Sequence, residues 1–363
     1  MSRRILICTQ AGDVHALAVG AVLRGVGAEV TTWDPRNFPA EQRISLEISR
    51  QEVRLGIDEQ GLESLADFDT IWLRRVDWHG LRHSRTRPTS ALARRHSAVF
   101  SDRIYDLFGD NAFWVNHKEH AARAEFKPKQ LEMARKVGFS IPHTLISNSA
   151  RRIREFAHQH GGRVIAKPLL GEALMESERS CLVLYAEHLD PSMLNDAEAI
   201  EKLPYIYQEY VPAACEIRVT IMGRNIFAAQ INLTDEGIPD AHRREIRSVG
   251  NFQLPGTVRE ACLHLMESLG LVFGCIDLLL TADQHVIFLE LNQAGQFLWL
   301  EHHVPECAYL ASFCALLLGQ ASLPDVRLEQ VLGSADFRSA LTAHPPAAAA
   351  SAATRDATDL SRR

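Results

Sequence analysis

The sequence lacks the hallmarks of several protein classes. Its seven cysteines stand singly, without a Cys-x-x-Cys pair, which argues against a disulfide framework or a zinc site. No apolar run approaches the ~20 residues of a membrane span, and the N-terminal MSRRILICTQ turns polar too soon for a signal peptide. Lys and Arg (39) are fewer than Asp and Glu (45), without a long basic stripe, so no nucleic-acid partner is expected. These absences predict a cytoplasmic globular protein that contacts no membrane.

The length of the chain indicates several lobes, because 363 residues are more than a single hydrophobic core usually accommodates. An apolar run at Arg4–Thr9, a helical pattern at His15–Val26 and a second apolar run at Glu29–Trp33 predict a β-α-β opening. A further strand is expected at Asp67–Leu73. We therefore expect an N-terminal α/β domain at residues 1–117.

Three charged residues follow the last of these strands directly. Arg74, Arg75 and Asp77 lie just past its carboxyl end, which is where open α/β sheets place their ligands. These residues are predicted to bind substrate, and the alternative is that they only cap the sheet.

A second, smaller lobe is expected at residues 118–205. A single helix is predicted over Glu119–Gly138, ending at a glycine, and a strand at His143–Ile146 follows. Another strand is predicted at Arg163–Pro168 and a polar loop at Gly171–Ser180. The fold class is thus mixed, with α/β and α+β parts.

The third lobe, residues 206–325, is predicted to be mainly antiparallel with one amphipathic helix at Thr257–Leu269. Residues 338–363 are Ala-rich and of low complexity, which predicts a disordered tail. The expected strands of the third lobe are Ile206–Glu209, Glu216–Met222, Asn225–Leu233, Gly274–Leu280 and Val286–Leu291.

The segment FLELNQAGQFLWLE carries the strongest local signal. Glu290 and Asn292 alternate with apolar neighbours, so both point to one face of a strand. Asp277 lies on the strand before, and a hairpin can bring its carboxylate beside them. Hard magnesium ions take carboxylate and amide oxygens together with phosphates, so these three residues are predicted to bind Mg²⁺. The alternative for each is a polar side chain facing solvent.

Two lysines indicate a phosphate site. Lys167 lies within the apolar strand VIAKP, where a buried ammonium needs an anionic partner. Lys127 lies one predicted helix earlier, and its alternative is a solvated surface residue. No GxxxxGK[ST] segment occurs, so a Walker-type loop is excluded.

A strand that runs into a Pro turn between the second and third lobes can present main-chain groups to an adenine. Glu216, on the next strand, could accept hydrogen bonds from ribose, and Arg218 alternates onto the same face, with a surface salt bridge as its alternative. The residues predicted to hold the adenine are Gln208, Glu209, Tyr210 and Val211.

The order of these motifs resembles that of ATP-grasp ligases. The resemblance covers roughly residues 118–318, and the first lobe looks like the pre-ATP-grasp domain of those enzymes. Within the superfamily, the segments WLRR, QEYVPAACEIRVTIMG and AGQFLWLE are similar to the microviridin-type peptide maturases, which make graspetides. The resemblance implies an ATP-grasp fold with an N-terminal pre-ATP-grasp α/β domain.

The resemblance also implies an activity. Such maturases use ATP and Mg²⁺ to convert a side-chain carboxylate of a ribosomally made precursor peptide into an acyl phosphate, which a hydroxyl or amine attacks to give a macrocyclic ester or amide. Arg218 and Arg243 would then be the catalytic arginines, and Lys127 and Lys167 would hold phosphates. The partner would be a precursor peptide with a leader segment, and a homodimer stays open.

Two segments depart from the family's pattern. The family usually has Asn-Pro where this sequence has Gln293-Ala294, which changes the shape of a turn rather than a catalytic group. The family's Asp-Trp-Arg corresponds at best to Ala241-His242-Arg243, or is shifted to Arg244. The identity of the second catalytic arginine is therefore open by one residue.

Two alternative functions remain. A RimK-type ligase that adds a free amino acid to a peptide or small-molecule carboxylate would share the ATP and metal residues, and only GQFLWLE argues against it. A non-catalytic homologue that merely binds a peptide would not need the complete set of lysines and metal ligands.

Overall fold

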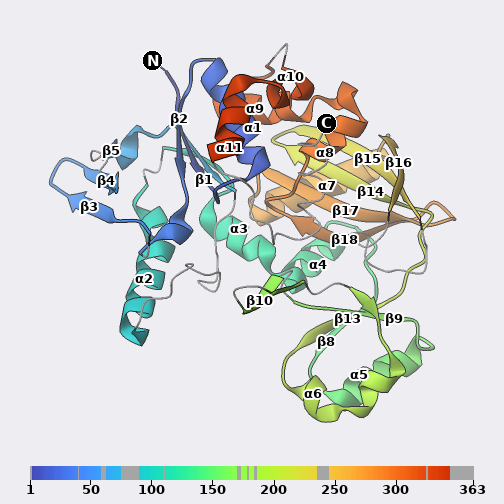
Figure 1. The fold of residues 1–363 in the computed structure, drawn as a ribbon. Helices are drawn as coiled ribbons and strands as arrows, with labels where there is room; N and C mark the ends of the chain where they lie inside the picture. Colours follow the sequence, from blue (N-terminus) through green and yellow to red (C-terminus); the bar gives the residue numbers. More distant parts are fainter. Residues whose placement is uncertain are drawn as a thin grey trace. The chain divides into compact units, whose positions relative to one another are not determined.

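The computed structural model describes residues 2–39, 41–58, 63–74, 90–108, 111–169, 173–177, 180–183, 186–234, 245–323 and 326–343. The chain divides into two compact units (Figure 1). The first unit takes Met1–Ala122, Leu271–Phe273 and Ala308–Pro346, and the second takes the remainder. Residues 308–325, which the sequence assigned to a third lobe, thus belong to the first unit.

A parallel four-stranded sheet in the order β2-β1-β6-β7 forms the centre of the first unit. Helix α1 connects β1 to β2, which confirms the predicted β-α-β opening, and the Asp13 side chain caps this helix by accepting from the Ala16 N–H. The bounds are β1 Arg4–Cys8, α1 Val14–Gly25, β2 Glu29–Trp33, β6 Thr70–Leu73 and β7 Phe113–Val115.

C-terminal helices pack on the first unit's core. Trp72 of β6 meets Phe313 of α9 edge-on, with ring centroids 4.8 Å apart, and the Thr70 hydroxyl donates to the Leu317 carbonyl. The prediction of disorder from residue 338 is wrong for residues 338–343, which are helical, because Phe337 is buried and anchors that helix. The helices are α9 Tyr309–Leu318, α10 Leu328–Leu332 and α11 Ala335–Ala343.

A small antiparallel sheet and a helix complete the first unit, and the sequence pattern did not predict them. Leu55, Phe68 and Tyr105 pack with Leu6 and Ile71 of the parallel sheet in one buried cluster. The elements are η1 Pro35–Asn37, β3 Ile44–Ile48, β4 Val53–Ile57, β5 Glu63–Ser64, η2 Leu65–Asp67, α2 Ala91–Arg103 and η3 Ile104–Leu107.

The second unit holds a small sheet in the order β12-β9-β13-β8, with Ile153 and Phe156 of α5 packed on it. Strands β10 and β11 pair antiparallel, and β10 lies where a polar loop was predicted, at Gly171–Ser180. The bounds are β8 Thr144–Ser147, α5 Ala150–Gln159, β9 Val164–Lys167, β10 Ala173–Ser177, β11 Ser180–Val183, β12 Glu187–His188, η4 Pro191–Asn195, α6 Ala197–Glu201 and β13 Tyr205–Glu209.

The single helix predicted over Glu119–Gly138 is two helices, α3 (Lys118–Glu125) and α4 (Lys127–Lys136). The backbone is extended at Phe126. Pro128 has no N–H to continue the first helix, but it fits the first turn of a new one. As a result Lys127 becomes the first residue of α4.

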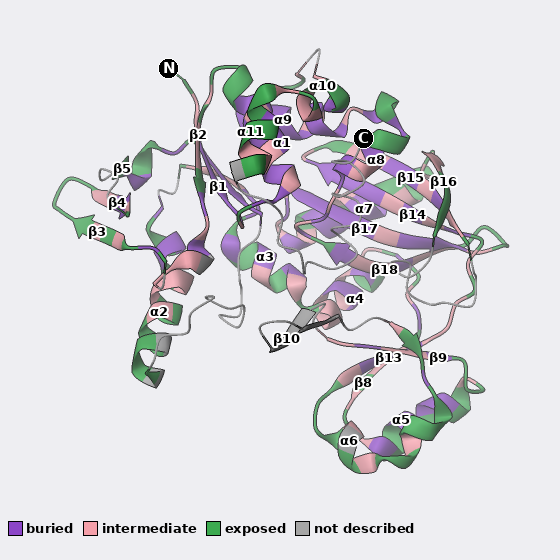
Figure 2. Ribbon diagram, in the orientation of Figure 1, coloured by how far each residue is buried: buried purple, intermediate pink, exposed green. Residues whose placement is uncertain are grey.

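A five-stranded sheet in the order β16-β15-β14-β17-β18 contains four of the five strands predicted for the third lobe, and β14 and β17 are mostly buried (Figure 2). The fifth, Ile206–Glu209, was wrongly placed in this lobe: as β13 it pairs with β8 and β9 in the small sheet. Strand β16 was not predicted. Helix α4 contacts both β18 and α7. The elements are β14 Cys215–Met222, β15 Asn225–Leu233, β16 Ile246–Asn251, α7 Gly256–Leu269, β17 Phe273–Leu280, β18 Val286–Asn292, α8 Leu298–His303 and η6 Pro305–Cys307.

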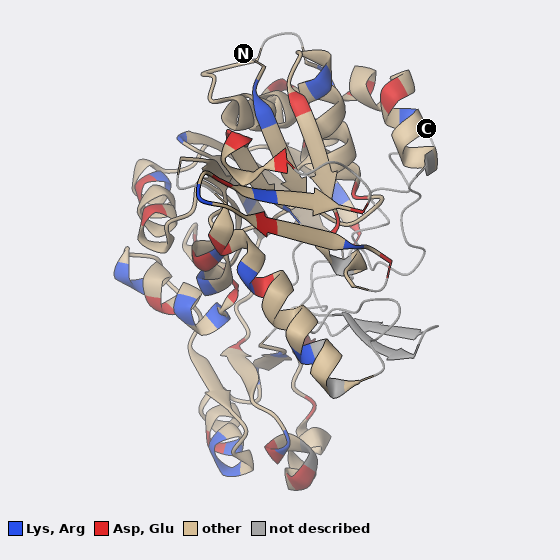
Figure 3. Cartoon of the chain, turned by 90° about the vertical axis from the view of Figure 1, so that its left-hand side faces the viewer, with Lys and Arg blue, Asp and Glu red and all other residues tan. Residues whose placement is uncertain are grey.

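Charges of both signs are interspersed along the helices and strands (Figure 3). None of the described helices combines the length and the apolar character that a membrane span requires.

Candidate active site

The site begins with two carboxylates placed opposite each other. In the antiparallel pair β17 and β18, Asp277 lies directly across from Glu290, and Cys275 across from Asn292. Residues opposite each other on adjacent strands share a sheet face, so the predicted hairpin does place all three candidate metal ligands on one face. Like charges in this position repel, so the pair needs cations beside it.

Two cations supply that charge. The Lys127 Nζ lies 2.7 Å from Glu290 Oε2, and Arg218 Nη1 lies 2.7 and 2.6 Å from the two oxygens of Asp277. The four side chains are 14 to 32% exposed, so these are partly desolvated, charge-assisted contacts. Residues from α4, β14, β17 and β18 thus meet in one charged cluster.

Arg218 is held in its charged form. Burial lowers its pKa, but the Asp277 carboxylate, together with Cys275 and Glu290, more than offsets this effect, so the pKa lies above its ordinary value. Among the described residues its Nε has no hydrogen-bond partner, although that atom is buried. An acceptor that approaches from the sheet face could use it.

Asn292 ends β18 and starts the turn that departs from the family's pattern. Its Oδ1 accepts a hydrogen bond from the Ala294 N–H at 3.0 Å, a contact that a proline at position 294 could not make. The carbonyl oxygen keeps a second lone pair, so Asn292 can still serve as an oxygen ligand.

Gly295 and Cys275 belong to this site, although the sequence pattern did not single them out. A Cβ on Gly295 would overlap Sγ and Cβ of Cys275 and lie 3.2 Å from Arg218 Nη2. The loop after β18 therefore crosses β17 at van der Waals distance, which only glycine permits. The sequence offered one indication of a role for Cys275: it lies two residues before Asp277 and therefore on the same strand face.

Gln130 covers the outer edge of β18. Its buried side-chain amide donates to the Leu291 carbonyl and accepts from the Leu291 N–H, both at 2.8 Å. Nearby, the buried Gln293 donates to Glu125 of α3 at 3.0 Å. These contacts attach Leu291 to α4 and Gln293, the residue after β18, to α3, and no local sequence pattern indicates them.

The remaining nucleotide candidates lie on the small sheet of the second unit and on β14. Lys167 ends β9, opposite Ile206, and is only 9% exposed. Gln208 is fully buried and donates to the Thr144 hydroxyl at 2.9 Å, while its Oε1 is unsatisfied among the described residues. Glu216 lies on β14, two residues before Arg218 and on the same face.

The predicted adenine segment uses part of its main chain within the sheet. The Glu209 N–H donates to the His143 carbonyl, and the Tyr210 N–H donates to the Arg163 carbonyl. The Glu209 carboxylate accepts from the His143 N–H at 2.8 Å. An adenine edge would therefore be read by other main-chain groups of the segment, such as the Glu209 carbonyl or the Val211 N–H.

Arg74 occupies a buried position in the first unit. Its side chain is fully buried, with Nε 3.4 Å from the Asp13 carboxylate at the start of α1. This pairing matches the alternative in which the residue caps the sheet. Arg75, Asp77 and Arg243 lie outside the described residues.

The chemistry of the cluster fits a magnesium nucleotide. Within the described part of the chain, no group of three or more His, Cys, Asp or Glu forms a complete metal site. Two opposed carboxylates and an amide are, however, the partial oxygen set that Mg²⁺ uses when phosphates complete its coordination. Lys127 and Arg218 supply the cations that phosphoryl groups need.

No protein-family model matches the sequence, and no curated relative matches it. Solved structures do match. The macrocyclase MdnC from Microcystis aeruginosa MRC, bound with precursor peptide MdnA, is 25% identical and has a TM-score of 0.73, with 88% of this chain and 100% of MdnC covered. The chain has the ATP-grasp fold.

Two further ATP-grasp structures agree. A Chryseobacterium gregarium RiPP-associated ligase in complex with ADP and a leader and core peptide is 21% identical, with a TM-score of 0.74 over 90% of this chain and 99% of that one. The ligase PsnB, complexed with a phosphomimetic variant of its minimal precursor, Mg and ADP, is 21% identical, with a TM-score of 0.66 over 88% and 99%. The expected resemblance to ATP-grasp peptide maturases, and with it the expectation of an enzyme, is confirmed.

Proposed function

We propose that this chain is an ATP-dependent ligase that condenses a side-chain carboxylate of a ribosomally made precursor peptide with a hydroxyl or amine. One observation carries the proposal. Asp277 and Glu290 lie opposite each other on the sheet face, each with its own cation, in a chain with the fold of peptide-bound ATP-grasp ligases.

The residues divide the binding of ATP and Mg²⁺ among themselves. Asp277, Glu290 and Asn292 would hold the metal, which supplies charge neutralisation between phosphates. Lys127 and Lys167 would bind phosphate oxygens, since both side chains are largely removed from water and a desolvated ammonium favours anionic partners. Gln208, Glu209, Tyr210 and Val211 would hold the adenine, and Glu216 the ribose.

The reaction needs positioning and charge rather than a covalent enzyme intermediate. The γ-phosphoryl group passes to the peptide carboxylate, giving an acyl phosphate and ADP. Attack by a hydroxyl or amine then forms the ester or amide, releases inorganic phosphate and transfers one proton to a base. Arg218, kept protonated by Asp277, would stabilise the transferring phosphoryl group, and Arg243 would assist.

A peptide substrate is supported by the matched structures, in which MdnC, the Chryseobacterium ligase and PsnB hold precursor or leader and core peptides. The GQFLWLE segment, where the resemblance to peptide maturases is most specific, leads into α8 directly after the proposed metal strand. Arg75 and Asp77 stay candidates for binding core-peptide carboxylates, whereas the buried Arg74, paired with Asp13, is a weaker one.

Intact mass spectrometry of a co-expressed candidate precursor tests the proposal. We expect the precursor to lose the mass of one water for each bond formed, and to keep its full mass with the Glu290→Ala or Asn292→Ala enzyme. An added amino-acid mass would instead identify a ligase for free amino acids. An unchanged mass with purified, nucleotide-binding enzyme would contradict macrocyclisation of that precursor.

A further inference from the structure

The strand that carries Glu290 and Asn292 has a neighbouring strand on one side only. β18 is the last strand of its sheet, and among the described strands only β17 pairs with it. Leu291, between the two candidate ligands, is 4% exposed, so its main-chain groups on the outer edge need partners other than water.

A bulge interrupts β18 directly before the candidate ligands. Asp277 lies opposite Glu290, but the next pair is Leu278 with Phe288, so Leu289 is an extra residue. A bulge disrupts the ladder locally and bends its strand. Beyond the bulge, the end of β18 keeps only three residue pairs with β17, at Glu290, Leu291 and Asn292. Its position therefore depends on what holds the outer edge.

Different groups hold the outer edge on the two sides of the bulge. Before it, the Ser140 carbonyl accepts from the Phe288 N–H at 2.8 Å. After it, the Gln130 side chain accepts from the Leu291 N–H and donates to the Leu291 carbonyl, both at 2.8 Å. A side-chain amide that bonds both main-chain groups of one residue takes the place that a neighbouring strand would occupy.

The amide of Gln130 also reaches a third segment. Its Nε2 donates to the Ala124 carbonyl near the end of α3, in addition to the Leu291 carbonyl. Both donors and the acceptor oxygen are thus engaged, and the side chain is only 3% exposed. Gln130 therefore joins α3, α4 and β18 at one buried point.

Gln130 lies one helical turn after Lys127, on the same side of α4, because residues three apart on a helix are neighbours. The two side chains meet consecutive residues of β18: Lys127 Nζ lies 2.7 Å from Glu290 Oε2, and Gln130 bonds Leu291. Only the first contact uses groups that would bind phosphate and metal. It must open when both ligands bind, whereas the second can persist.

Given the proposed function, on which this role rests, we propose that Gln130 is a positioning residue for the magnesium nucleotide. It keeps the phosphate-binding Lys127 aligned with the metal-binding Glu290 and Asn292 while the ion pair between Lys127 and Glu290 opens. Mg²⁺ demands near-ideal octahedral geometry, so a small displacement of β18 against α4 weakens a metal that bridges the strand and the phosphates. The effect of Gln130 therefore falls on the coupling between metal and nucleotide.

Isothermal titration calorimetry of the full chain with ADP, in excess EDTA and in excess Mg²⁺, measures this coupling as the ratio of the two dissociation constants. Gln130→Met nearly keeps the side-chain volume and removes all three hydrogen bonds. We expect the ratio to fall at least about tenfold, as is usual when a group that supports a metal ligand is removed. ADP affinity in EDTA should change by less than about threefold, because Lys127 still pairs with Glu290.

Hydrogen exchange of the Leu291 N–H tests the contact itself. Gln130→Met should speed this exchange at least about tenfold, because a local hydrogen bond is lost while the fold persists. The matched control is Gln42→Met, at another buried glutamine, which accepts from the Trp33 indole N–H at 2.9 Å in the first unit. It should leave both the coupling and the protection of Leu291 unchanged.

Gln130→Glu carries the same test where Gln130→Met does not fold. It keeps the shape and the acceptor for the Leu291 N–H, but a carboxyl group cannot donate to both carbonyls. The coupling should then fall at least about threefold, the equivalent of one net hydrogen bond.

Three results would overturn this role of Gln130. These are a coupling that both Gln130 variants leave unchanged, an exchange rate at Leu291 that does not respond, and an equal loss of coupling in Gln42→Met. A natural chain whose ADP affinity does not depend on Mg²⁺ would overturn the proposed function as well. An unmodified precursor, beside a natural coupling that Gln130→Met abolishes, would contradict the peptide chemistry while supporting the role of Gln130.

Discussion

At the scale of single residues, the charged side chains of the proposed metal site form ion pairs with one another. The Lys127 Nζ, which would bind a phosphate, is held by Glu290 at 2.7 Å, and Glu290 would bind the metal. To bind Lys127, a nucleotide without metal must break this ion pair, which leaves the Glu290 carboxylate unpaired near the phosphates. When both bind, a phosphate replaces Glu290 as the partner of Lys127, and the metal ion replaces Lys127 as the partner of Glu290. We therefore expect the binding of metal and nucleotide to be coupled.

The substitution Glu290→Gln tests how the ion pair and the metal each affect nucleotide binding. The neutral amide releases Lys127, so ADP in excess EDTA should bind the variant more tightly than the natural chain, by roughly five- to tenfold, the size of a partly buried ion pair. Added Mg²⁺ should raise ADP affinity strongly in the natural chain and little in the variant. Isothermal titration calorimetry measures both.

Glu132→Gln is the matched control, because Glu132 is an acid on the same helix as Lys127 that pairs with Lys129 and Lys136 instead. It should leave ADP affinity unchanged with and without metal. Weaker metal-free ADP binding by Glu290→Gln would refute the role of this ion pair.

At the scale of elements, the C-terminal helix α9 belongs structurally to the N-terminal sheet. Trp72 of β6 and Phe313 of α9 are both buried, and the Phe273 ring lies 4.8 Å from the Phe313 ring, measured between centroids. Residues from distant parts of the sequence thus share one aromatic core, and the first unit cannot be complete without α9.

Trp72→Ala should therefore destabilise the first unit by about 3 to 5 kcal/mol, the usual cost of removing a large buried aromatic side chain. Met193→Ala, at a position 58% exposed, should cost less than about 1 kcal/mol. Urea unfolding followed by circular dichroism measures both. Similar midpoints for the two variants would show that the aromatic cluster contributes little.

At the scale of the whole molecule, buried thiols are a shared feature of the core. Six cysteines of the described part of the chain are buried and form no disulfide: Cys8, Cys215, Cys262, Cys275, Cys307 and Cys314. Burial raises the pKa of Cys262 to about 12. Burial, with a smaller contribution from the nearby Asp34 carboxylate, raises the pKa of Cys8 even further above its ordinary value. Both thiols stay protonated, and hence unreactive, near neutral pH.

In a Cys181→Ser chain, iodoacetamide at pH 8 should modify these thiols at least about 100-fold more slowly in the folded than in the urea-unfolded state. An unfolded thiol has a pKa near 8.5, so it releases its proton first and the free energy of unfolding should fall above roughly pH 9. Mass spectrometry of labelled chains follows the reaction. Equal labelling rates would contradict burial.

The sequence by itself determined the chemistry of the candidate site. Alternation alone assigned Glu290 and Asn292 to one strand face, and the apolar runs on either side predicted the hairpin that brings Asp277 opposite. The order of the two lysines, the strand that runs into a Pro turn and the strand with Glu290 and Asn292 indicated the ATP-grasp fold. Such local patterns are readable because the two-residue period of a strand fixes which side chains share a face.

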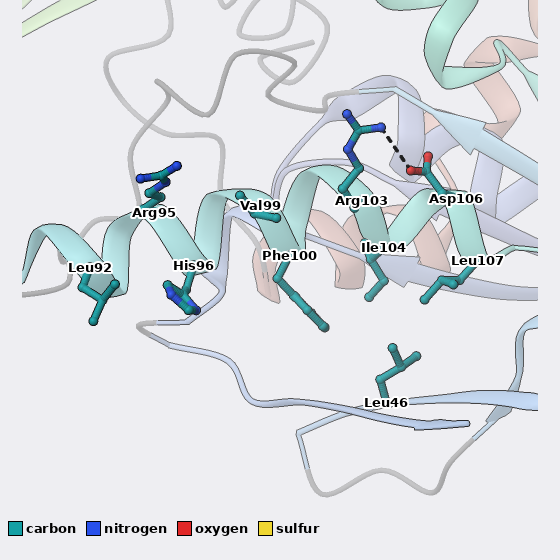
Figure 4. A pocket seen from close by; sticks show the side chains of 10 residues that line it. All are labelled: Leu46, Leu92, Arg95, His96, Val99, Phe100, Arg103, Ile104, Asp106 and Leu107. Carbon is teal, nitrogen blue, oxygen red and sulfur yellow. Dashed lines mark hydrogen bonds and ion pairs between the residues drawn. The ribbon is translucent and has the colours of Figure 1, made fainter. Parts of the chain in front are cut away.

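Only the tertiary structure decided the partners of these residues. That Lys127 meets Glu290, that Gln130 covers Leu291 and that Gly295 touches Cys275 depends on how α4 and the loop after β18 pack, and no local pattern encodes this packing. The edge strand β3 and the apolar groove beside it, between β3 and α2 (Figure 4), were likewise not predicted from the sequence. The apolar alternation of β3 is short, and the groove exists only because α2 packs beside this strand. Contacts between distant segments arise from burial of shared surface, which the order of residues does not display.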